Sequence, residues 1–237
     1  MKNLSVVSLF LLVLIFFSAG TAAGEKHVLF REDFHSLENW KPLYFPKIKK
    51  HTTYTIVKKG NEHYLRAESN ASASALTYKE KFNVYDYPGI RWRWKVDNTY
   101  VKGNPVMKSG DDYPVRVYVV FDYDSEKAGF FERLKNSLIE KLYGELPHSS
   151  LNYVWSSKAL KQNIVTSPYT DRVKIILLEK GGENIGTWRD EEINIIEDYR
   201  KAFGEPPPAV ASLAIMNDSD NTGESSVSFL EYLEVYR

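Results

Sequence analysis

Residues 110–121, which read GDDYPVRVYVVF, decide the fold that we predict for this chain. Two adjacent carboxylates come first, a proline follows shortly after them, and a run of β-branched and aromatic residues completes the stretch. One face of that run is apolar throughout: Val115, Val117, Val119 and Phe121. The other face carries Arg116, Tyr118 and Val120, so the run alternates like a strand with both faces mostly covered. The stretch therefore predicts an acidic loop that leads into an interior β-strand.

Short apolar runs of the same kind recur along the chain, with turn signals between them. The clearest cover residues 28–34, 52–58, 63–68, 90–96, 151–156, 173–179, 210–216 and 227–236. Gly60 and Asn61, between two of these runs, are typical of a β-hairpin. Strands and helices do not alternate, which argues against a doubly wound sheet. About eleven short strands predict an all-β, jelly-roll-like two-sheet β-sandwich.

Two segments depart from the strand pattern. Between about 126 and 143 the apolar residues recur at helical spacing, which predicts an amphipathic helix inserted between two strands. Its role is open between a lid over a site and a cap over an exposed end of the sheet. A short second helix is predicted over about 191–203, with Gly204 as its stop.

The first residues have the pattern of a secretory signal peptide over 1–23. Lys2 gives a positive start, an apolar run covers 6–17, and small residues occupy 18–23. The apolar run is shorter than the roughly 20 residues that a membrane span needs, and no later stretch could span a bilayer. We therefore predict export, no membrane span after cleavage, and a single β-sandwich domain over 24–237. An uncleaved anchor is the alternative, because only one positive charge precedes the run.

Composition excludes several classes of function. The 237 residues contain 31 Lys and Arg against 31 Asp and Glu, and no cysteine. This balance predicts no nucleic-acid partner and no basic patch for a membrane surface. Without cysteine there is no disulfide, no cysteine-ligated metal and no thiol nucleophile. The chain also lacks a GxSxG elbow and an HExxH motif, so the sequence favours a protein without catalytic activity.

Asp111, Asp112 and Arg116 form the first candidate site. An arginine within a strand needs a partner, and a nearby carboxylate is the obvious one. The functional interpretation is a ligand-binding site at the start of the strand; the alternative is a structural ion pair beside a solvated turn. Trp155 and Trp188 lie near predicted strand ends and are the candidate rings for stacking on a sugar, with core packing as the alternative.

The second candidate is a cation loop over 218–223, DSDNTG, with Asp218, Asp220 and Thr222 as metal ligands. Oxygen ligands at alternate positions before a glycine resemble the start of a calcium loop. Phe229 stands at the twelfth position, so the segment is not an EF-hand. Hard oxygen ligands favour calcium over zinc; the alternative is a polar turn between two strands. If both acidic loops serve one site, they lie at the same end of the sandwich, with the arginine of the first candidate site between them.

Six stretches occur together in a recognisable order. They are 69–76 (SNASASAL), 90–94 (IRWRW), 110–121, 152–155 (NYVW), 198–205 (DYRKAFGE) and 214–223 (AIMNDSDNTG). Together they resemble the bacterial family known as domain of unknown function 3047. The resemblance implies an exported, single-domain protein of a Gram-negative-type bacterium, with the periplasm as the favoured compartment and the extracellular space as the alternative. It implies no activity.

A weaker, architectural likeness concerns the first strand. Residues 31–34 (REDF) precede a tryptophan loop, and together with a closing last strand they resemble jelly-roll carbohydrate-binding modules, some of which carry a structural calcium. We therefore expect a non-catalytic protein that binds a glycan or another polar envelope component and is stabilised by a cation. Two alternatives stay open. One is a carboxylate-dependent glycan hydrolase that uses carboxylates of the two acidic loops; the other is a structural envelope protein without a ligand.

Overall fold

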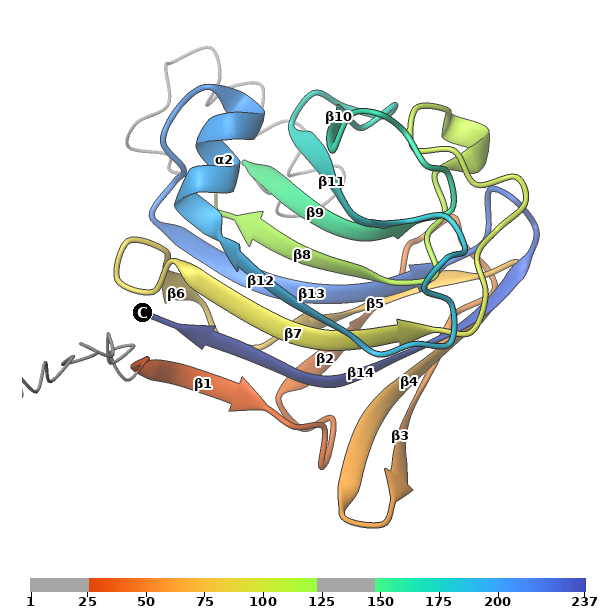
Figure 1. The fold of residues 1–237 in the computed structure, drawn as a ribbon, viewed down its shortest axis with the longest axis horizontal. Helices are drawn as coiled ribbons and strands as arrows, with labels where there is room; N and C mark the ends of the chain where they lie inside the picture. Colours follow the sequence, from red (N-terminus) through yellow and green to blue (C-terminus); the bar gives the residue numbers. More distant parts are fainter. Residues whose placement is uncertain (1–25, 123–147) are drawn as a thin grey trace, which may run out of the picture.

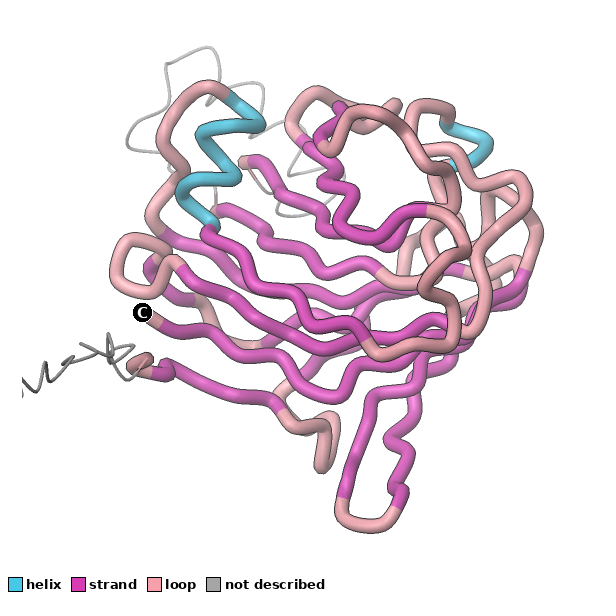
Figure 2. Tube along the Cα trace, viewed as in Figure 1, coloured by secondary structure: helices cyan, strands magenta, loops and turns pink. Residues whose placement is uncertain are grey.

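The computed structural model describes residues 26–122 and 148–237. Two β-sheets pack face to face, and the α-helix α2 (Ile195–Phe203) lies at one end of the sandwich (Figure 1). Strands dominate the described part of the chain, as Figure 2 shows. None of the helices within the described ranges is long and apolar enough to cross a membrane.

Sheet A is built around the last strand of the chain. Its order is β12-β7-β14-β4-β3, and β1 also pairs with β14. The strands are β1 (Val28–Glu32), β3 (Thr53–Lys59), β4 (Glu62–Asn70), β7 (Gly89–Val96), β12 (Arg189–Asn194) and β14 (Ser225–Tyr236). Every pair in this sheet is antiparallel. Since β14 pairs with β1, β4 and β7, it holds three other segments of the sheet in place.

Sheet B contains the strand that was predicted from residues 115–121. Its order is β10-β11-β9-β8-β13-β5-β2, and β6 pairs with the start of β13. The strands are β2 (Trp40–Leu43), β5 (Ala73–Tyr78), β6 (Phe82–Asn83), β8 (Arg116–Phe121), β9 (Ser149–Ser156), β10 (Ile164–Thr166), β11 (Val173–Lys180) and β13 (Val210–Asp218). β9 and β11 run parallel, and the other pairs are antiparallel. Because β8 lies between β9 and β13, it is an interior strand, as predicted.

The core fills the space between the inner faces of the two sheets. Trp92 and Trp94 of β7 are fully buried, and so are Val117 and Phe121 of β8. Alternate residues of each strand point inward because the side-chain period of a strand is two. Burial of each such side chain contributes roughly 1.5–3 kcal/mol to folding. The chain contains no cysteine, so packing supplies the stability that disulfides would otherwise add.

The structure confirms the two-sheet β-sandwich and the hairpin at Gly60, whose positive φ of 64° suits the β3–β4 turn. The second helix begins later than predicted, because residues 191–194 belong to β12 and pair with β7. Asn194 then caps the helix, its side chain accepting hydrogen bonds from the N–H groups of Ile196 and Glu197, and Gly204 ends it as predicted. The predicted helix over 126–143 and the predicted signal peptide lie outside the described residues.

Candidate functional site

The two acidic loops meet at one end of the sandwich. β8 and β13 are antiparallel neighbours, with Arg116 opposite Met216, so the start of β8 lies beside the end of β13. The loop that contains Asp111 and Asp112 enters β8, and the loop 219–224 follows Asp218, the last residue of β13. Their predicted placement at the same end is therefore correct, and the antiparallel register is its physical cause.

Arg116 joins the two loops through a buried ion pair with Asp218. Its Nε donates to Asp218 Oδ1 at 2.8 Å, and its Nη2 contacts Asp218 Oδ2. Nη2 also donates to the carbonyl oxygen of Asp111 at 2.6 Å, and the guanidinium lies 4.3 Å from the ring centroid of Tyr113. Arg116 is 5% and Asp218 1% exposed, so solvent screens this pair little. The predicted carboxylate partner of Arg116 exists, and it comes mainly from the more distant loop.

Asp112 holds the second loop in shape. Its Oδ2 accepts a hydrogen bond from the N–H of Thr222 at 2.6 Å, and its Oδ1 accepts one from Asn221 Nδ2 at 3.1 Å. The Thr222 hydroxyl is buried and lies 3.5 Å from the carbonyl oxygen of Ser219, within its own turn. The sequence predicted Thr222 as the third oxygen ligand beside Asp218 and Asp220. In the structure the third side chain grouped with these two aspartates is Asp112, from the first loop.

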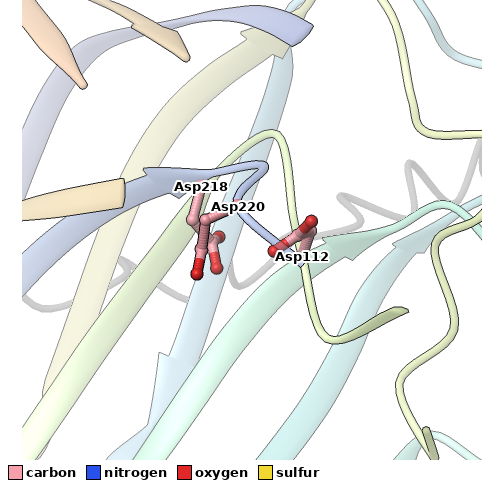
Figure 3. A group of neighbouring side chains, drawn as sticks. All are labelled: Asp112, Asp218 and Asp220. Carbon is pink, nitrogen blue, oxygen red and sulfur yellow. The ribbon is translucent and has the colours of Figure 1, made fainter. Parts of the chain in front are cut away.

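One carboxylate oxygen each of Asp112, Asp218 and Asp220 lies within 4.8 Å of the other two (Figure 3). We call Asp111, Asp112, Asp218 and Asp220, together with Arg116, the acidic cluster. Burial raises the pKa of the Asp218 carboxyl, and the charge of Arg116 opposes that rise. Burial and the nearby Asp112 also raise the pKa of Asp220. The carboxylates therefore crowd one another, with one buried guanidinium among them.

Tyr169 is an exposed aromatic residue beside the acidic cluster. Its side chain is 54% exposed, and its hydroxyl lies 2.9 Å from Asn221 Oδ1 and 3.2 Å from the carbonyl oxygen of Lys108. Burial, followed by the charges of Asp111 and Asp220, raises the pKa of Tyr169. Sequence reasoning missed this residue, since the loop between β10 and β11 has no motif that marks a site.

A family model described as "Protein of unknown function (DUF3047)" matches residues 38–234. The chain belongs to this family. The match confirms the family that the six sequence stretches indicated. A search of curated proteins finds no match to the sequence.

Solved structures with a similar arrangement are distant in sequence from this DUF3047 member. A family 11 carbohydrate-binding module of a cellulosomal cellulase from Clostridium thermocellum is 10% identical, with 90% of this chain and 95% of that chain covered and a TM-score of 0.42. The xyloglucanase domain of NopAA from Sinorhizobium fredii is 8% identical, with 88% and 99% covered and a TM-score of 0.44. The expected likeness to carbohydrate-binding modules is thus found, but likeness this distant does not identify a ligand.

Of the two tryptophans predicted to bind ligand in this DUF3047 chain, Trp155 lies in the core. It is fully buried in the core, with its ring centroid 6.1 Å from that of Trp94, because its position on β9 faces inward. Trp188 is partly buried and contacts Tyr64 and Phe229 of sheet A, at centroid distances of 5.5 and 6.4 Å. Trp155 is therefore part of the core, and Trp188 packs against side chains of sheet A.

Proposed function

We propose that this protein binds a carbohydrate without transforming it, at the acidic cluster, with Tyr169 as the ring on which a sugar stacks. The observation that carries the proposal is the half-exposed ring of Tyr169 beside the cluster. Its hydroxyl donates a hydrogen bond to Asn221 Oδ1, and Asn221 Nδ2 donates one to Asp112 Oδ1. An aromatic ring offers a flat apolar face beside its polar hydroxyl. A few fixed polar groups next to such a face orient a ligand. Sugar C–H faces and hydroxyl groups match these two kinds of surface.

The hydrogen bonds of the cluster favour binding over catalysis. A glycosidase needs one carboxyl group that gives a proton and another that attacks or activates water, both directed at the substrate. Here Asp218 is paired with Arg116, and Asp112 accepts hydrogen bonds from the turn at Asn221 and Thr222. Both carboxylates are engaged in holding the loops together. They therefore suit the support of a binding surface better than acid–base chemistry.

A panel of polysaccharides tests the proposal, with affinity measured by calorimetry on the purified protein. We expect Tyr169→Ala to weaken binding about tenfold, which is about 1.4 kcal/mol, the upper range for one aromatic contact. Tyr85→Ala is the matched control, because Tyr85 is 46% exposed and lies in the turn before β7, at the opposite end of the sandwich. That variant should bind like the unchanged protein.

Three results would contradict the proposal. Binding to none of the polysaccharides would remove its basis. Equal losses in Tyr169→Ala and Tyr85→Ala would move the binding surface away from the acidic cluster. Release of reducing ends from a bound polysaccharide would show that the protein is a hydrolase, which is the alternative that the sequence left open.

We also propose that the protein is exported, and the support is the signal-peptide pattern of residues 1–23. N-terminal sequencing of the protein from separated cell fractions tests this. We expect a mature chain that begins at residue 24, found in the periplasm or, as the alternative, in the medium. An uncut chain in the cytoplasm would show that the pattern does not direct export.

A further inference from the structure

Two imidazole rings meet where the β3–β4 hairpin leaves the body of the sandwich. His63 lies on β4, close to the tip of the hairpin, and His35 lies in the loop 33–39 between β1 and β2, which we call the β1–β2 loop. The hairpin projects beyond the rest of the sandwich, with this loop beside it (Figure 1). The centroids of the two rings are 4.3 Å apart, and their planes meet at 65°. The contact therefore joins the hairpin to the β1–β2 loop.

The backbone of the β1–β2 loop has an unusual conformation directly before His35. Phe34 has a φ of 52°, which residues with bulky side chains rarely adopt. Its side chain is fully buried, and its N–H donates a hydrogen bond to Glu32 Oε1 at 2.8 Å. The other oxygen of Glu32 accepts a hydrogen bond from Trp40 Nε1 at 3.1 Å. The surrounding structure thus holds the strained residue in place and fixes the direction in which the chain continues to His35.

His63 is poorly placed to take a second proton. Its Nδ1 is buried and has no hydrogen-bond partner within the described residues. In an imidazolium both ring nitrogens carry an N–H group, so protonation would leave a buried donor without an acceptor, which is costly. Lys58 is the partner of His63 across the hairpin, and the side chains of such a pair lie on the same face of the sheet. A cation therefore stands beside the imidazole.

The electrostatic surroundings of His63 act in the same direction. Burial, followed by the charges of His35 and Lys58, lowers the pKa of His63 below its usual 6.5. Glu62, the preceding residue, accepts a hydrogen bond from the Tyr64 hydroxyl at 2.9 Å, and both side chains lie on the other face of β4. The folded state therefore holds a proton on His63 less tightly than the unfolded state does, and acid disfavours the contact.

We propose that the contact between His35 and His63 is sensitive to pH: it holds the β3–β4 hairpin to the β1–β2 loop at neutral pH and separates in acid. Imidazole is the side chain whose charge ordinarily changes between about pH 5 and pH 8. When both rings are protonated, two cations face each other, with Lys58 as a third. The stabilisation by the contact is complete above about pH 6.5 and is lost as pH falls through the lowered pKa of His63. The inference does not depend on the carbohydrate proposal, because no ligand takes part.

Amide hydrogen exchange at about pH 7.5 and about pH 5, corrected for the intrinsic effect of pH on exchange, tests the inference. We expect the amides of 53–70 to lose protection in acid, while those of β8 and β13 keep theirs. His63→Phe retains an aromatic ring that takes no proton, so it should abolish the loss, and Lys58→Met should reduce it. His51→Phe is the matched control, because His51 is exposed and its ring packs on Tyr44 at a centroid distance of 4.4 Å. It should lose protection like the unchanged protein.

A titration of the histidine rings by NMR keeps the test decisive if His63→Phe does not fold. In the unchanged protein the ring of His63 should titrate below its usual pKa of 6.5, and the amide shifts of the hairpin should follow the same midpoint. A midpoint at or above 6.5 would overturn the inference. So would equal protection of the hairpin at both pH values, or the same loss of protection in a folded His63→Phe variant as in the unchanged protein.

Discussion

Arg116 and Asp218 show how much depends on single residues at this end of the molecule. They are 102 positions apart in the chain, and both are buried. In a buried ion pair the attraction offsets the cost of removing both charges from water, so the net stabilisation by the pair is modest. The loss of one partner is far more costly, because the other charge stays buried without compensation.

Replacement of Arg116 by Met should therefore lower the free energy of unfolding by about 3–5 kcal/mol. Asp218→Asn in the Arg116→Met background should recover part of that loss, because it removes the charge left behind. Urea denaturation followed by circular dichroism measures both changes. A loss below about 1 kcal/mol in Arg116→Met would mean that the pair is more solvated than its burial indicates.

Asn217, the neighbour of Asp218, lies in a buried hydrogen-bond network between the sheets. Its Nδ2 donates to the carbonyl oxygen of Ala67 at 3.1 Å, and its Oδ1 accepts from Ser226 Oγ at 3.0 Å. Asn217→Ala would leave both partners without this amide, so we expect a loss of about 1–3 kcal/mol in unfolding free energy. The same denaturation measurement checks it, with Asn61→Ala in the exposed β3–β4 turn as a control for loss of an amide.

The sequence alone could predict the Arg116 ion pair only in part. A strand pattern shows that Arg116 shares β8 with core residues and needs a partner. Which carboxylate it meets depends on the order of strands in sheet B, and no local pattern contains that order. Tyr169 is a harder case, because its exposure beside the cluster results from how the β10–β11 loop folds back. Periodicity also placed Trp155 near a strand end without showing that its face is the buried one.

At the level of elements, the edge strand β12 places a partly buried acidic side chain next to a core tryptophan. Glu191 accepts a hydrogen bond from Trp94 Nε1 at 3.1 Å. Burial, followed by the neighbouring charge of Glu179, raises the pKa of Glu191 to about 7. The helical spacing at 195, 196, 199 and 203 predicted α2, but it did not show that residues before 195 extend along β7. An edge strand without strict alternation gives little sequence signal.

The raised pKa makes folding stability depend on pH. The folded state holds the Glu191 proton more tightly than the unfolded state, whose carboxyl has the usual pKa of 4.5. This contribution is complete below about pH 4.5 and is lost as pH rises through about 7. Relative to the unchanged protein, Glu191→Gln should therefore gain about 1–3 kcal/mol between pH 5 and pH 8. Denaturation curves at both pH values measure this, and a constant difference would contradict the expected pKa.

At the scale of the whole molecule, the sequence shows which strand faces are buried, but it does not show the order of the strands in the two sheets. The alternation of apolar residues fixed which faces are buried, and it predicted two sheets around an aromatic core. Pairing between distant strands decided the rest, since β14 joins β1, β4 and β7 across most of the chain. Such non-local pairing leaves no mark at any one position.

A truncated chain that stops at residue 224 tests how much β14 contributes to folding. It lacks the central strand of sheet A and the buried residues Leu230, Leu233 and Val235. We expect this chain to lose cooperative thermal unfolding and to bind a hydrophobic dye, because the inner faces of β4 and β7 lose their neighbour. A sharp melting transition in the truncated chain would show that sheet B and the remaining strands fold without β14.

The position of β14 also sets a time order during synthesis. The ribosome makes β1, β4 and β7 first, and each then waits for residues 225–236 before its pairing in sheet A is complete. Until those residues leave the exit tunnel, β7 and β4 present unpaired edges and exposed tryptophan faces. Exposed apolar faces and unpaired strand edges make a nascent chain prone to aggregation. Sheet A is therefore completed only after residues 225–236 have been made, rather than strand by strand along the way.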